Sequence, residues 1–265
     1  MELVPALLIL LAGIGAGAIN AVVGSGTLIT FPALVAFGVP PVTATMSNAV
    51  GLVPGNIASS LGYREELRGQ GRRLLQLAPA SLLGALCGAW LLLHLPERAF
   101  IRIVPVMLIV ALVLVVVQPL LQRWLKSRKA HTDLPAPAAE PPPLGAGRAV
   151  LVILATFLTA IYGGYFAAAQ GIILIALFGL LLPDSLQRIN GAKNVLVLVV
   201  NTVAASCYII VGHDRIDWAA VGLIAVGSLI GGYFGARLGR RFNPIVLRAV
   251  IVALGLVALW RILGM

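Results

Sequence analysis

Apolar residues follow one another along this chain in long runs, and two of the runs exceed the length of one membrane span. Residues 3 to 38 form the first run, interrupted by Gly24-Ser25-Gly26, and residues 149 to 182 form the second, interrupted around Gly163-Gly164 and Gln170-Gly171. A spanning helix needs roughly 20 residues. Each run therefore predicts a full helix followed by a half-helix or re-entrant segment. At membrane depth such a break is tolerated only where protein or a water-filled cavity satisfies the freed amide and carbonyl groups.

Shorter apolar runs predict the other helices, in the same order in each half of the chain. They lie at about 40 to 61, 74 to 93 and 99 to 121, and again at 185 to 211, 218 to 236 and 244 to 263. The sequence itself also repeats: Ser81–Ala89 recurs as Ser228–Ala236, Thr45–Asn48 as Gly191–Asn194, and Ser25-Gly26 as Gln170-Gly171. Internal repeats with matching glycine breaks are typical of secondary transporters that bind substrate where the repeats meet.

The repeats divide the chain into three parts. We expect a first transmembrane repeat at 1–121, a proline-rich cytoplasmic linker at 122–147 and a second transmembrane repeat at 148–265. Basic residues concentrate at 62–73, 122–148 and 237–243, and the positive-inside rule places all three segments in the cytoplasm. Loops at 94–98 and 212–217 and both termini then lie outside. The prediction is an all-α polytopic membrane protein with two inverted-topology repeats and broken or re-entrant helices.

Composition supports the membrane environment and excludes other classes. Hydrophobic residues make up 60% of the chain, charged residues 11%, and mean hydropathy is +1.03. These values predict a multi-pass protein of the cell (inner) membrane with the lipid bilayer as a partner. The net charge of +10 lies in loops, so we expect no nucleic-acid partner. A homodimer stays open. We find no metal-ligand cluster, phosphate loop or nucleophile elbow, so we expect no metal, no cofactor and no enzyme activity.

Several motifs resemble the TauE/SafE family of sulfite-exporter-like permeases. In the first half they are Asn20–Thr27 running into Pro32, Ala44–Asn48 with Pro54, and Tyr63–Leu67; in the second they are Ile161–Phe166, Gln170-Gly171 and Ile189–Asn194 with Asn201. The resemblance implies transport of a small sulfur-containing or organic anion, such as sulfite, thiosulfate, sulfoacetate or another sulfonate. Ala167 to Ala169 stand where glycine is common in the family.

An anion carrier needs positive potential and hydrogen-bond donors at mid-membrane, and Lys193 is the first candidate. It lies about eight residues, or roughly 12 Å, into its helix. An ammonium there costs at least about 2.5 kcal/mol on insertion scales, so it marks a functional site by default. The nearest carboxylate on its own segment, Asp184, is nine positions earlier. The alternative is that Lys193 only snorkels or binds free carbonyls of the broken segment.

Paired polar residues of the two repeats complete the predicted substrate site. Asn48 and Asn56 match Asn194 and Asn201, each pair spaced by about two helical turns, although interhelical hydrogen bonding is an equal alternative. The breaks would add amide groups and helix dipoles. The full substrate-binding set is Lys193, Asn194, Asn48, Ser47, Gln170, Gly171, Ser25, Gly26, Asn201 and Asn56. The other functions left open are an anion channel and a membrane scaffold without transport.

Overall fold

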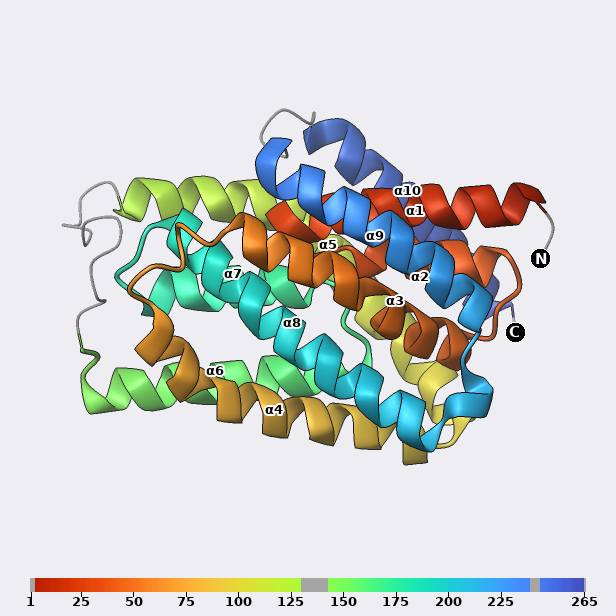
Figure 1. The fold of residues 1–265 in the computed structure, drawn as a ribbon, viewed down its shortest axis with the longest axis horizontal. Coiled ribbons are helices and arrows are strands. Elements are labelled where there is room, and N and C mark those ends of the chain that lie inside the picture. Colours follow the sequence, from red (N-terminus) through yellow and green to blue (C-terminus); the bar gives the residue numbers. More distant parts are fainter. Residues whose placement is uncertain (1–2, 130–142, 239–243, 265) are drawn as a thin grey trace.

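The computed structural model describes residues 3–129, 143–238 and 244–264, and all regular secondary structure within these residues is helical. The first half comprises α1 (Leu3–Val22), α2 (Thr27–Ala36), α3 (Pro41–Gly62), α4 (Gly71–His94) and α5 (Glu97–Lys129). The second comprises α6 (Ala146–Tyr165), α7 (Gln170–Leu181), α8 (Leu186–Val211), α9 (Trp218–Leu238) and α10 (Pro244–Leu263), with a short 3-10 helix, η1 (His213–Arg215), before α9. Their order matches the predicted one, and Figure 1 shows them as a helical bundle.

Both predicted breaks are present. The first falls at Val23–Gly26, between α1 and α2. The second falls at Phe166–Ala169, so the flanking Gly163, Gly164 and Gln170 are helical and the non-helical residues include Ala167 and Ala169, with φ of 64° and 61°. Left-handed backbone is strained for alanine and free for glycine. These two alanines therefore hold a conformation that glycine adopts more readily.

Helix lengths separate full spans from half-spans. Among the described residues, six helices are long and apolar enough to cross a membrane: α1, α4, α5, α6, α8 and α9. The apolar helices α2 and α7 have 10 and 12 residues, so at 1.5 Å per residue they cover only about half of a hydrocarbon layer roughly 30 Å thick. The protein is therefore a polytopic membrane protein with two short helices at its breaks.

One predicted boundary was wrong. Helix α5 continues to Lys129 instead of ending at about 121, so the first eight residues assigned to the linker are helical. Arg123 and Lys126 in this extension are exposed, so charged residues do not end the helix. The proline-rich residues 134–142 of the linker lie outside the described residues.

The helices of the two halves interleave. Helix α1 packs on α9 and α4 packs on α6, while α3 lies between α8 and α9, and α8 between α3 and α4. Small residues permit the closest of these contacts: a Cβ on Gly17 would lie 2.8 Å from Ser228 Cα, and one on Gly88 would lie 2.8 Å from Tyr165 N. Small residues spaced by four on α1 (Gly13, Gly17), α4 (Gly84, Gly88) and α9 (Gly231, Gly235) let helices approach closely, so they serve helix packing. Gly239, the last of that series, lies outside the described residues.

Candidate functional site

The two chain breaks touch each other at the centre of the bundle. Gly171 N, at the start of α7, donates a hydrogen bond to Gly24 O at 3.0 Å. Gly24 has a φ of 82°, and a Cβ on it would lie 2.5 Å from Gly171 Cα. No side chain fits between the two backbones. Segments 147 residues apart in the chain (171 − 24) thus form one junction, which we name the break junction, Gly24–Gly26 with Gln170–Gly171.

Lys193 lies against this junction. A Cβ on Gly24 or on Gly171 would be 3.1 Å or 2.9 Å from Lys193 Cδ, so the lysine stem passes both glycines. The side chain has no exposed surface, and its Nζ donates a hydrogen bond to Asn20 O at 2.9 Å. Within the described residues this is the acceptor found for Nζ, which carries three N–H donors.

The first turns of α8 present three polar side chains to the end of α1. Besides Lys193, both Asn190 Nδ2 and Asn194 Nδ2 donate to Ala21 O, each at 3.2 Å. The last carbonyls of a helix lack partners within the helix, and a cation is favoured there by the helix dipole. Asn190 was missed as a site residue from the sequence, although its spacing of three and four residues from Lys193 and Asn194 places it on the same helix face.

Asn20 is a second residue that the sequence analysis did not select. Its Nδ2 donates to Asn56 Oδ1 at 2.5 Å, and its Oδ1 accepts a long hydrogen bond of 3.4 Å from Gly26 N. Asn48 serves α2 instead: its Nδ2 donates to Thr27 Oγ1 at 3.1 Å, and its Oδ1 accepts from Thr30 Oγ1. Asparagines of α1 and α3 therefore hold the first break and the start of α2.

Some buried polar atoms near these residues have no hydrogen-bond partner in the described part of the chain. They are Ser25 Oγ, Asn56 Nδ2, Gln170 Oε1, Asn190 Oδ1 and Asn201 Oδ1. Leaving a buried polar group unpaired costs roughly 1–3 kcal/mol, so such groups are ordinarily satisfied by water or a ligand. Four of the five belong to the predicted substrate-binding set, and the fifth is Asn190.

The hydrogen bond that Ser47 makes does not connect it to the break junction. Ser47 is fully buried, and its Oγ accepts a hydrogen bond of 2.9 Å from Asp217 N, just before α9. Asn201 lies two turns beyond Asn194 on α8, and no hydrogen bond links it to the other members of the set. Among the described residues, no group of three His, Cys, Asp or Glu side chains is placed to hold a metal ion.

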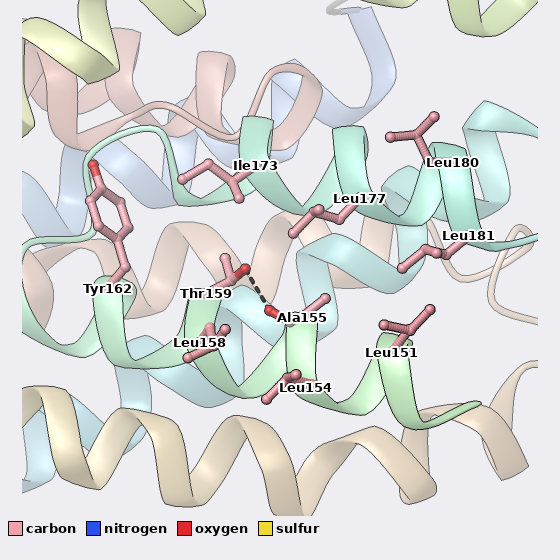
Figure 2. Close-up of a pocket in the computed structure, with 10 residues that line it drawn as sticks. All are labelled: Leu151, Leu154, Ala155, Leu158, Thr159, Tyr162, Ile173, Leu177, Leu180 and Leu181. Atoms are coloured by element: carbon pink, nitrogen blue, oxygen red, sulfur yellow. Dashed lines mark hydrogen bonds between the residues drawn. The ribbon is translucent and has the colours of Figure 1, made fainter. Parts of the chain in front are cut away.

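An apolar groove of about 520 Å³ lies between α6 and α7 (Figure 2). Its two polar side chains are already engaged, because Thr159 Oγ1 donates to Ala155 O at 2.7 Å and Tyr162 donates to Ala168 O. The other lining residues are leucine, isoleucine and alanine: Leu151, Leu154, Ala155, Leu158, Ile173, Leu177, Leu180 and Leu181. Without free donors the groove suits hydrocarbon and does not suit an anion. The tyrosine bond holds the second break instead.

Comparison with known proteins identifies the family. The profile of the family described as sulfite exporter TauE/SafE matches residues 9–262. The "Probable membrane transporter protein YfcA" of Escherichia coli strain K12 is 24% identical over 238 residues, covering 89% of this chain and 81% of the relative. A "Probable membrane transporter protein" of Haemophilus influenzae is 22% identical over 241 residues, covering 91% and 87%. No solved structure matches the chain. The chain therefore belongs to the TauE/SafE family and is a multi-pass transporter of the cell membrane, not an enzyme.

Proposed function

We propose that this transporter moves a small sulfur-containing or organic anion, such as sulfite, thiosulfate or a sulfonate, and binds it at the break junction beside Lys193. The observation that carries the proposal is the complete burial of the Lys193 ammonium where the two breaks meet. In the described residues its contact is a backbone carbonyl, and Asp184 is engaged by two arginines. A buried cation held by one neutral acceptor is a strong attractor for an anion.

Hydrogen-bond donors around Lys193 would orient the bound anion. Asn194, Asn48 and Asn56 present amide groups, and Ser25 lies in the first break. Gln170 is the first residue of α7, and Gly26 and Gly171 mark the starts of the two half-helices. Helix N-termini carry partial positive charge and suit oxyanions. Asn201 extends the polar face of α8. Ser47 is engaged with Asp217 and joins the site only if that bond is released.

We further propose that the halves are inverted repeats. One observation supports the repeat and a second supports its inversion. The main helix contacts each have a counterpart made by the matching helices of the other half. The contact of α1 with α9 corresponds to that of α6 with α4, and the contact of α2 with α10 corresponds to that of α7 with α5. In Figure 1, α1 runs from the N-terminus at the right toward the left, whereas its counterpart α6 begins at the left and runs toward the right.

Cysteine labelling of intact cells checks the topology. We expect a cysteine at Arg72, or at Arg240 in the segment outside the described residues, to react with a membrane-impermeant maleimide only after the cells are opened, because inverted repeats place both positions in the cytoplasm. The background carries Cys87→Ser and Cys207→Ser, and a cysteine at Asp214, in η1, is the outward-facing control. Reaction of the Arg240 cysteine in intact cells contradicts the inverted topology.

Transport itself is tested with purified protein in liposomes. We expect saturable uptake of at least one of labelled sulfite, thiosulfate or sulfoacetate, with competition by the unlabelled anion and none by choline. A scaffold would leave uptake at the level of protein-free liposomes. A channel would conduct without saturation and without exchange of internal for external anion. Absence of uptake for all three anions in monodisperse, correctly inserted protein contradicts the proposed substrate class.

The paired asparagines give a quantitative prediction. Asn194→Ala or Asn48→Ala removes a donor from the proposed site, and an unpaired buried group costs about 1–3 kcal/mol, so substrate binding should weaken roughly five- to a hundredfold. Ser206→Ala is the control, because this exposed hydroxyl on α8 binds Thr202 O away from the junction. Substrate affinity is measured by calorimetry in detergent. Unchanged affinity in both asparagine variants assigns them to helix packing.

A further inference from the structure

A buried ion-pair cluster joins the two halves at one end of the molecule. Arg73, in the first turn of α4, pairs with one oxygen of Asp184, in the connection between α7 and α8. Arg188 Nε, in α8, lies 3.2 Å from the other oxygen. The three residues are 8%, 1% and 4% exposed. Charged side chains are almost never this buried unless they are paired, so the cluster forms only when these segments are in contact.

Hydrogen bonds donated by side chains tie α8 to the segment that precedes α4. Arg188 Nη1 donates to Arg68 O at 3.1 Å, and Gln70 Nε2 donates to Arg188 O at 3.0 Å. Farther along α8, Asn190 Nδ2 donates to Tyr63 OH at 2.7 Å. The connection between α3 and α4 therefore covers the first turns of α8. Arg188 and Lys193 are five positions apart, about 7.5 Å along the helix. The cluster therefore lies between the break junction and this end of the molecule along α8.

The positions that match Arg73 and Arg188 in the other repeat carry apolar side chains. The repeat that aligns Gly84 with Gly231 aligns Arg73 with Ala220, and the one that aligns Asn48 with Asn194 aligns Arg188 with Val42. Ala220 and Val42 are buried in the main apolar core, 0% and 5% exposed. The matching positions thus carry charged side chains at one end and apolar side chains at the other.

We infer that Arg73, Asp184 and Arg188 form a latch that closes the substrate site toward the cytoplasm, and that opening to this side requires the latch to separate. When the ion pair opens, its charges regain hydration, and this offsets most of the attraction that is lost. The free energies of the closed and open forms are therefore nearly equal. An apolar closure exposes hydrocarbon when it opens and has no such compensation. The inference rests on the proposed inverted topology and site position, but not on the identity of the anion.

The test measures access to the junction rather than transport. Ser25→Cys, a buried position in the first break, serves as reporter in a background lacking Cys87 and Cys207. Inside-out and right-side-out membrane vesicles are treated with an impermeant maleimide. Asp184→Asn leaves two buried guanidiniums without their carboxylate, so we expect labelling from the cytoplasmic face to rise about tenfold or more. Labelling from the outer face should not rise.

Two further variants separate the latch from misfolding. Arg73→Gln keeps the Asp184–Arg188 pair and should raise cytoplasmic labelling by a smaller factor in stably folded protein. Arg72→Gln removes the same charge from the exposed neighbouring position and should have no effect. Unchanged labelling in monodisperse Arg73→Gln protein overturns the latch, as does a rise confined to right-side-out vesicles. A confirmed latch in protein that fails to transport sulfite or sulfonates would reject the proposed substrate class alone.

Discussion

Lys193→Met is expected to lower the transport rate at least about a hundredfold while the protein stays folded and inserted. Two unit charges about 4 Å apart attract by roughly 4 kcal/mol at an effective dielectric constant of 20, and part of this is lost to desolvation of the anion. Methionine keeps an unbranched stem past Gly24 and Gly171 but cannot attract the anion. The variant loses one hydrogen bond, to Asn20 O, and it also loses the cost of a buried ammonium, so its thermal stability should stay close to that of the parent.

Uptake into liposomes and thermal unfolding in detergent, measured on the same preparation, check this result. Lys193→Arg should retain part of the transport rate if charge alone matters, and little if the junction admits only a compact ammonium. Lys126→Met, on the exposed extension of α5, is the control for loss of one positive charge. If Lys193→Met transports at the parental rate but unfolds at a lower temperature, the lysine is a tether for the end of α1 and not a substrate ligand.

Local signals in the sequence were sufficient to predict the helices and the two breaks. Gly24 and Gly26 interrupt an apolar run that is too long for one span, and the structure ends α1 and starts α2 at that place. The prediction failed at α5, where Arg123 and Lys126 indicated a loop. Charged residues show where a helix leaves the hydrocarbon layer, but they are good helix formers and do not end the helix.

Contacts between distant segments could not be predicted in the same way. Asp184 was considered as a neighbour of Lys193 along one helix, whereas its partner Arg73 is 111 positions away. In the sequence Arg73 is one of several basic residues that indicate a cytoplasmic loop, and nothing there indicates that its side chain is buried. The alternative stated for Lys193, that it binds a free carbonyl of the broken segment, matches the contact in the structure, but nothing in the sequence specifies that this carbonyl is the one of Asn20. Such partners depend on how the two halves interleave.

Contact between the two breaks should be the most sensitive point of the fold, so Gly24→Ala is expected to abolish transport and to destabilise the protein. Alanine at a left-handed position costs roughly 1–2 kcal/mol. Its Cβ would also lie 2.5 Å from Gly171 Cα, and because both sides of this contact are backbone, no change of rotamer relieves the overlap. Overpacking adds about 1–3 kcal/mol and moves Gly171 away from Lys193.

Gly38→Ala is the matched control for this variant. Gly38, between α2 and α3, has a φ of 85°, close to that of Gly24, but a Cβ there meets nothing within 4 Å. The control therefore carries the backbone strain without the overlap, and its transport rate should stay near that of the parent while its unfolding temperature falls slightly. Both quantities are measured side by side in liposomes and in detergent. Should Gly24→Ala match Gly38→Ala in both, the contact between the breaks is not needed for transport, and the substrate site must be sought on the polar face of α8 alone.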